Sequence, residues 1–160
     1  MGNSTALDRT DREIIGALRK NARLSNKELA ALVGLAPSSC LQRVRKLERR
    51  GVLRGYHAEV DPAALGVGLQ AIVAIRLSRH SRAFVDSFRE HVLSMPEVRV
   101  VYHVAGASDF LLHVAVKDAE HLRELVLGAF TVRPEVAHVE TALIFEQVRN
   151  VELPVAREGT

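Results

Sequence analysis

Eight polar or cationic side chains lie close together in the first third of the chain. They occupy one window of thirteen residues, as Ser38, Ser39, Gln42, Arg43, Arg45, Lys46, Arg49 and Arg50. Arginine and lysine bind phosphate oxygens, whereas serine and glutamine hydrogen-bond to base edges, directly or through water. The residue types and their spacing therefore predict a contact with double-stranded DNA.

The same window has helical periodicity with two different faces. At 100° per residue from Arg43, the apolar side chains fall between about 40° and 160°. These are Cys40, Leu41, Val44 and Leu47. Polar and cationic side chains fall between about 200° and 300°, and Arg43 and Arg50 flank the boundary, where a long side chain can reach sideways to a phosphate. Such a helix fits the major groove, about 12 Å wide. The alternative is an ordinary amphipathic helix whose polar face is only solvated.

The charge distribution agrees with a DNA contact in the first third. Residues 1–60 carry 12 Lys or Arg against 6 Asp or Glu, whereas residues 61–160 carry 10 against 13. The first part is the candidate polyanion-binding segment, and the remainder is not.

A second candidate site is the stretch Gly106–Asp109, between two predicted strands. Glycine allows a ligand to approach the backbone closely, and the exposed N–H groups of a turn can hold a carboxylate. The carboxylate of Asp109 could hold an ammonium group. Glycine and aspartate are also common in ordinary hairpin turns, so the residues alone leave both interpretations open.

Patterns typical of catalysis or metal binding are not found. Ser108 lacks the second glycine of a nucleophile elbow, and Cys40 falls on the apolar face of its helix. The seven histidines form no His-Glu-x-x-His motif, and there is one cysteine. We expect a protein that is not an enzyme and that holds neither a metal nor a cofactor.

Composition favours a soluble, cytoplasmic protein with no membrane contact. Apolar residues make up 48% of the chain, yet no run approaches the roughly 18 to 20 apolar residues that a membrane span requires. The first residues lack a secretory signal, and a single cysteine fits a reducing compartment. A DNA-binding protein of this kind would be associated with the nucleoid.

Three helices are expected before residue 51. The first covers residues 8–20. Ser25 and Glu28 form a capping box at the start of the second. Pro37 suits the first turn of the third helix, and Gly51 suits a left-handed cap at its end. The second and third helices, joined by a short turn, make a helix-turn-helix.

The rest of the chain alternates between strand and helix patterns. We predict strands at 69–77, 98–104, 110–116 and 139–148, and helices at 83–95 and around 122–130. This β-α-β-β-α-β order is that of an α+β, ferredoxin-like sandwich with both helices on one face of an antiparallel sheet. The predicted domains are a helix-turn-helix (1–51), a hinge strand and linker (52–65, with the strand at 52–60), the ferredoxin-like domain (66–150) and a C-terminal tail (151–160).

The other face of that sheet would be exposed in a monomer. Residues 71–75 are Ala-Ile-Val-Ala-Ile, which is apolar on both sides of the strand. An exposed apolar area of several hundred Å² usually has a partner. A second copy related by two-fold symmetry is the simplest partner, so we predict an obligate dimer.

Five stretches of the chain resemble the Lrp/AsnC, or feast/famine, regulators. They are Leu7-Asp8-x-x-Asp11-x-x-Ile14, Asn21-Ala22-Arg23-Leu24-Ser25, Leu29-Ala30-x-x-Val33-Gly34-Leu35, Cys40-Leu41-x-Arg43-Val44-x-x-Leu47-Glu48-x-x-Gly51-Val52-Leu53-x-Gly55-Tyr56 and Gly106-x-x-Asp109-Phe110-Leu111-Leu112. The resemblance covers about residues 7 to 150 and rests on the order and spacing of all five stretches.

The resemblance implies a winged helix-turn-helix, joined by a hinge strand to a ligand-sensing domain whose dimers pair into tetramers, octamers or discs. It also implies that an amino acid binds between subunits, against the turn at 106–109 and a neighbouring subunit's last strand. The implied effector-binding residues are Tyr102, Gly106, Ala107, Ser108, Asp109 and Thr141. In one departure, this chain has Ala107 and Ser108 where many members have an acidic residue followed by an aromatic residue.

Three functions are compatible with these observations. The expected one is a sequence-specific transcriptional regulator whose oligomeric state and DNA affinity respond to a small effector, an amino acid. The second is a ligand-independent architectural DNA-binding protein whose C-terminal domain only oligomerises. The third is a small ferredoxin-like enzyme with a helical appendage, and the absence of a catalytic motif counts against it.

Overall fold

The computed structural model describes residues 7–79 and 81–148. Within these residues the chain divides into two compact units, and the division lies between Glu59 and Val60. Each unit has a hydrophobic core of its own. The predicted tail at 151–160 lies outside the described residues.

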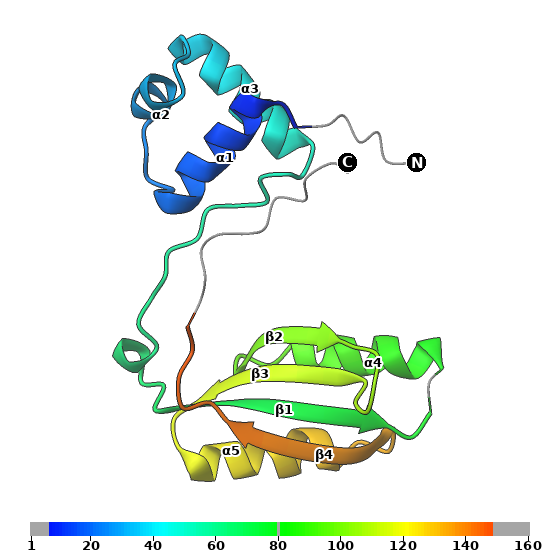
Figure 1. The fold of residues 1–160 in the computed structure, drawn as a ribbon. Helices are drawn as coiled ribbons and strands as arrows, with labels where there is room; N and C mark the ends of the chain where they lie inside the picture. The colour runs from blue at the N-terminus through cyan, green and yellow to red at the C-terminus, as the bar shows by residue number, and fades with distance from the viewer. Residues whose placement is uncertain (1–6, 80, 149–160) are drawn as a thin grey trace. The chain divides into compact units, whose positions relative to one another are not determined.

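The first unit consists of three helices (Figure 1), namely α1 (Arg9–Lys20), α2 (Asn26–Leu32) and α3 (Pro37–Arg49). Ser25 and Glu28 make both hydrogen bonds of the predicted capping box at the start of α2. Pro37 occupies the first turn of α3, and Gly51 follows that helix with φ of 68°, in the left-handed conformation that glycine adopts at low cost. The local signals in the sequence therefore predicted the helix ends.

The three helices enclose one apolar core. Its buried members are Ile14, Leu18, Leu29, Ala30, Cys40 and Leu47. Cys40 and Leu47 come from the face of α3 that periodicity predicted to be apolar. Burial raises the pKa of the Cys40 thiol, so little reactive thiolate forms at neutral pH.

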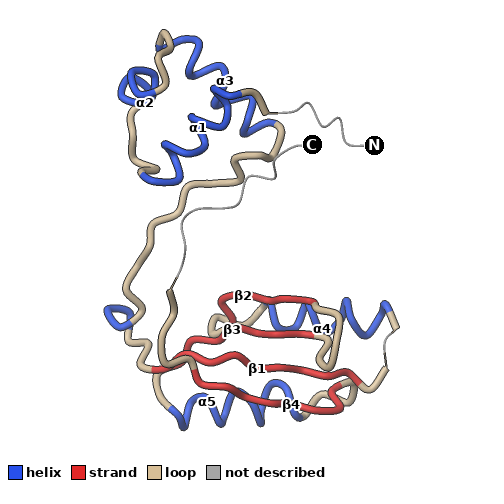
Figure 2. Tube along the Cα trace, in the orientation of Figure 1, coloured by secondary structure: helices blue, strands red, loops and turns tan. Residues whose placement is uncertain are grey.

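The segment after α3 is not a strand. Figure 2 draws residues 52–60 as a loop, so the prediction of a hinge strand is wrong for the single chain. A strand requires a neighbouring strand to pair its backbone groups, and the described residues pair none with this segment. Instead, the N–H groups of Val52 and Leu53 both donate to the Leu47 carbonyl, at 2.9 and 3.3 Å, which ties the segment to the end of α3.

The second unit is a four-stranded antiparallel sheet with two main helices. Its elements are η1 (Ala63–Leu65), β1 (Leu69–Leu77), α4 (Arg82–Leu93), β2 (Val98–His103), β3 (Phe110–Val116), α5 (Ala119–Leu125), the π-helical turn η2 (Val126–Thr131) and β4 (Val136–Leu143). The strands lie side by side in the order β2-β3-β1-β4 (Figure 1). This confirms the predicted β-α-β-β-α-β order and α+β fold.

The last strand begins and ends earlier than the predicted 139–148. Val136 already pairs with Leu77, across a register shift in β1. At the other end, the Ile144 N–H donates to the Gln70 carbonyl at 2.9 Å. Because β1 begins at Leu69, only one residue beyond Gln70, it offers no further length for pairing, and the strand ends.

Both helices cover the same face of the sheet. Alternate residues of β1, from Ala71 to Leu77, are buried with residues of α4 and α5 in one core. The intervening residues and their cross-strand neighbours point to the other side, which we call the open face: Gln70, Ile72, Ala74, Arg76, Val100, Tyr102, Leu111, His113, Ala115, His138, Glu140 and Ala142. Six of these twelve are aliphatic, and they include the β1 residues Ile72 and Ala74, so the feature that predicted a dimer is present in the structure.

Candidate nucleic-acid interface and effector site

Six of the eight predicted DNA-contacting residues lie exposed on α3 or in its first turn. They are Ser38, Ser39, Gln42, Arg45, Lys46 and Arg49. Within the described part of the chain, their side chains make no hydrogen bond or ion pair. This surface, which we call the α3 polar face, presents hydroxyl, amide and cationic groups that can contact bases and phosphates.

The other side of α3 is anchored to the first two helices. Cys40 and Leu47 are 0% and 1% exposed. The Asn26 side-chain amide donates to the Pro37 carbonyl at 2.8 Å, which fixes the first turn of α3 against the start of α2. A helix held in this way can present its polar face to a groove without a change in the unit's own fold.

Arg43 does not belong to the α3 polar face. Its Nη1 lies 2.6 Å from Asp8 Oδ2 and 2.8 Å from Asp11 Oδ1, and Asp11 is buried. Hydrogen bonds from the Asp11 N–H and then from Arg43 lower the pKa of Asp8. Arg43 lies at the boundary of the helix, where we predicted that it reaches sideways to a phosphate, but in the structure it reaches the two carboxylates at the start of α1. Arg50, the other boundary residue, is half-buried just after the helix.

Arg43→Ala should destabilise the first unit, whereas Lys46→Ala should not. The first change leaves the buried Asp11 carboxylate without its cationic partner, and an unpaired buried acceptor is costly. We expect the melting temperature to fall by roughly 5–10 °C for Arg43→Ala and by no more than about 1 °C for Lys46→Ala. Differential scanning calorimetry of both variants measures this, and equal melting temperatures would contradict a structural role for Arg43.

The turn between β2 and β3 is fixed to the end of β1. The Val104 N–H donates to the Asp109 carbonyl at 2.9 Å, and the Asp109 N–H donates to the Ile75 carbonyl at 2.8 Å. The Asp109 carboxylate accepts a hydrogen bond from the Leu77 N–H at 2.7 Å. In the structure, Asp109 therefore helps to hold the turn in place. The sequence suggested a different role, in which its carboxylate holds an ammonium group.

The tip of this turn can accept an anionic group. Gly106 has φ of 137°, a conformation that other residues rarely adopt. Gly106 and Ala107 are exposed, and Ser108 is half-buried. Their backbone N–H groups have no hydrogen-bond partner among the described residues. Unpaired N–H groups in a turn are the arrangement that holds a carboxylate.

The remaining two predicted effector residues are separated within one chain. Tyr102 lies on β2, in the same hairpin as the turn, and is 52% exposed. Thr141 lies on β4, at the opposite edge of the sheet, where it lines a shallow groove with residues of α5 and η2. One chain does not bring Thr141 to the turn, so a site containing both requires a second copy.

The described residues offer no candidate for a metal site or a membrane-spanning helix. No group of three or more His, Cys, Asp or Glu side chains is arranged to hold a metal ion. No helix in the described ranges is long and apolar enough to cross a bilayer.

Comparison with known proteins agrees with both units. Residues 7–54 match the family model of winged helix-turn-helix DNA-binding domains, and residues 70–152 match that of the Lrp/AsnC ligand binding domain. The transcriptional regulator AldR of Mycolicibacterium smegmatis is 46% identical over 143 residues, which cover 89% of this chain and 84% of AldR.

Solved structures show the same architecture. A transcriptional regulator from Neisseria meningitidis, in complex with L-methionine, is 30% identical with a TM-score of 0.86, and the match covers 94% of this chain and 98% of that one. A feast or famine regulatory protein from Mycobacterium tuberculosis, also with L-methionine, is 34% identical with a TM-score of 0.82, over 91% and 96% of the two chains. The relatives are regulators and not enzymes, which agrees with the sequence prediction. The chain belongs to the Lrp/AsnC family of transcriptional regulators, with a winged helix-turn-helix domain followed by an α+β ligand-binding domain.

Proposed function

We propose that this regulator binds specific DNA sequences through α3 and that an amino acid alters its assembly and its DNA affinity. The observation that supports DNA binding is the α3 polar face, whose six side chains are exposed while the opposite side of the helix is buried. Its targets would place the protein on the nucleoid.

The residues of the α3 polar face divide into two roles. Ser38, Ser39 and Gln42 lie in the N-terminal half of α3, the part that meets base edges in a helix-turn-helix complex. Arg45, Lys46 and Arg49 would contact phosphates, and Arg50 would add a phosphate contact after the helix. Arg43 acts indirectly, because it ties α3 to α1.

An amino acid suits the turn at 106–109. Its carboxylate can accept hydrogen bonds from the N–H groups of Gly106, Ala107 and Ser108. Asp109 holds the turn in place, and Tyr102 lies in the same hairpin. We assign Thr141 to the same site from a neighbouring subunit. Two structural relatives were solved with L-methionine, which supports an amino acid as the class of effector.

Ligand binding between subunits would act through geometry. Each assembly presents its recognition helices at one set of spacings. An effector favours one assembly only by its difference in affinity for the alternatives. Occupancy of the turn would then change which pairs of half-sites the protein can bind.

The architectural alternative is favoured by one feature. Ala107 and Ser108 provide no charged or aromatic side chain at the tip of the turn, so recognition there depends on backbone groups. If the turn binds nothing, the second unit serves only to assemble the protein on DNA.

A thermal-stability screen with the twenty amino acids separates the two functions. A ligand that binds only the folded state stabilises it by about 2.7 kcal/mol at a hundredfold excess over Kd. We expect at least one amino acid to raise the melting temperature in a concentration-dependent way. Gly106→Val should abolish the increase, because a β-branched residue disfavours φ of 137°. No increase with any amino acid would leave the architectural function.

A further inference from the structure

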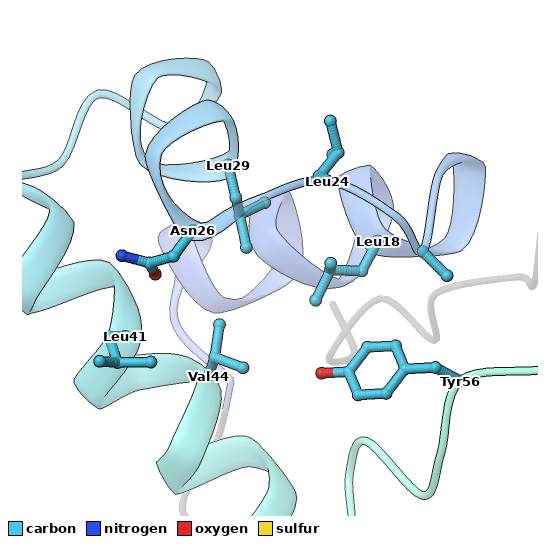
Figure 3. Close-up of a pocket in the computed structure, with 8 residues that line it drawn as sticks. Leu18, Leu24, Asn26, Leu29, Leu41, Val44 and Tyr56 are labelled. Carbon is cyan, nitrogen blue, oxygen red and sulfur yellow. The ribbon is translucent and has the colours of Figure 1, made fainter.

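The segment that follows α3 supplies one wall of a pocket in the first unit, through Tyr56, which is 46% exposed. The pocket has a volume of about 170 Å³ and lies between the three helices (Figure 3). Its lining residues are Leu18, Ala22, Leu24, Asn26, Leu29, Leu41, Val44 and Tyr56. Seven of them come from the helices and their connections, whereas Tyr56 comes from the segment predicted to be a hinge strand.

Two kinds of contact hold Tyr56. Its ring lies beside the apolar side chains of Leu18 and Val44, with the hydroxyl directed toward α3 (Figure 3). The hydroxyl donates to Glu48 Oε1 at 3.0 Å. Burial and this carboxylate raise the pKa of the Tyr56 phenol, so the donor proton is retained over the physiological range.

Tyr56 is the last of several attachments along the segment. Val52 and Leu53 donate backbone hydrogen bonds to the Leu47 carbonyl, and the Leu53 side chain packs on the core of the first unit. After Tyr56, Val60 is 52% exposed and does not line this pocket. The chain is therefore attached to the helices up to Tyr56.

We propose that Tyr56 is a positioning residue for DNA binding: it fixes the point at which the chain leaves the helices and thereby limits the half-site spacings that a dimer can bind. This inference rests on the proposed function, since it concerns two helix-turn-helix units bound to one duplex. Tyr56 itself does not touch DNA in this account. Tyr56 affects half-site spacing because it sets how many residues after α3 are free to extend.

The expected effect is large enough to measure. If Tyr56 is released, the last attachment becomes Leu53, three residues earlier. A fully extended chain spans about 3.3–3.6 Å per residue, so each protomer gains at most about 10 Å of reach. Base pairs are about 3.4 Å apart along the duplex, so this reach corresponds to about three base pairs per protomer. A longer free segment also lowers the effective concentration of the partner's helix-turn-helix at any one half-site spacing.

In vitro selection from a duplex library tests this directly. A random region of about 40 base pairs accommodates two half-sites at several helical turns of about 10.5 base pairs. The full-length wild type should enrich paired half-sites at one spacing. Tyr56→Ala should enrich the same half-sites with spacings spread over about three to six base pairs. Tyr56→Phe, which keeps the ring beside Leu18 and Val44, should retain most of the narrow distribution. Val60→Ala, in the same segment, is the matched control and should behave as wild type.

A second measurement separates positioning from damage to the fold. Affinity of Tyr56→Ala for a duplex with one copy of the selected half-site should stay within about twofold of wild type, because α3 is unchanged. Glu48→Ala, which removes only the hydrogen-bond acceptor, should broaden the spacing partially. Identical spacing distributions for wild type, Tyr56→Ala and Glu48→Ala would overturn the inference. Broader spacing that is accompanied by loss of single half-site binding would also overturn it. If the wild type enriched no half-site at all, the proposed function would fail, and this inference with it.

Discussion

Ile72→Glu is expected to convert the protein from a dimer into a monomer. Ile72 lies near the centre of the open face, paired with His113 of β3 on one side and Ala142 of β4 on the other. If two copies pair through this face, burial of one isoleucine stabilises the assembly by about 1.5–3 kcal/mol, and both copies contribute one. Two carboxylates brought together there would add repulsion and a desolvation cost. A loss of about 4 kcal/mol raises Kd by roughly a thousandfold.

Sedimentation or light scattering measures this result. Wild type should have a mass of at least about 35 kDa, twice the 17.6 kDa of one chain, and the variant should have the mass of one chain. Affinity for a duplex with two half-sites should fall by about 10²- to 10⁴-fold, because the second binding event is no longer intramolecular. Leu93→Glu adds the same charge at an exposed apolar position on α4 and should leave the mass unchanged. An unchanged mass for Ile72→Glu would contradict pairing through the open face.

Removal of the three cations of the α3 polar face should nearly abolish DNA binding. Arg45, Lys46 and Arg49 are exposed and have no partner among the described residues, so their loss should leave the fold intact. Each phosphate contact contributes about 0.9 to the slope of log K against log salt. The triple alanine variant should therefore have a slope shallower by about 2.7 for each bound helix. At 0.1 M salt this corresponds to a loss in affinity of two to three orders of magnitude.

Fluorescence anisotropy with a labelled duplex of mixed sequence, over a range of salt concentrations, gives both quantities. The matched control removes three arginines from the second unit, as Arg82→Ala, Arg89→Ala and Arg123→Ala. These side chains are 96%, 49% and 59% exposed, and among residues 7–79 and 81–148 they pair only with neighbouring carboxylates on their own helices. The control carries the same net charge as the test variant, so equal slopes for the two would assign DNA binding to overall charge and not to α3.

The sequence predicted the helices well, because their signals are local. The capping box of Ser25 and Glu28, the proline at the start of α3 and the glycine after it act within one turn of the helix they delimit. The two errors in strand assignment have the opposite cause. Residues 52–60 alternate as a strand does, and residues 144–148 include the apolar Ile144, Phe145 and Val148. A strand exists only where another strand can pair with it, and that partner is distant in the sequence.

The same distinction applies to the candidate sites. The helical wheel placed Arg43 correctly at the boundary of α3, but it gives an angle and not a partner; Asp8 and Asp11 are 35 and 32 residues away. The acidic residues at the start of α1 were visible in the sequence, although nothing linked them to Arg43. Tyr56 was visible only as part of a family resemblance. Thr141 was placed at the effector site by resemblance, and the strand order shows why one chain cannot supply it there.

Site-specific photo-cross-linking tests most directly whether α3 enters the DNA groove. A photoreactive phenylalanine derivative is placed at Gln42 in one preparation and at Arg82, on α4, in another, and each is irradiated with a duplex bound at low salt. We expect position 42 to cross-link to bases in the duplex, an excess of unlabelled duplex to suppress this cross-link, and position 82 to give none. Cross-linking from position 82 with none from position 42 would contradict DNA binding through α3, because DNA would then lie on the second unit.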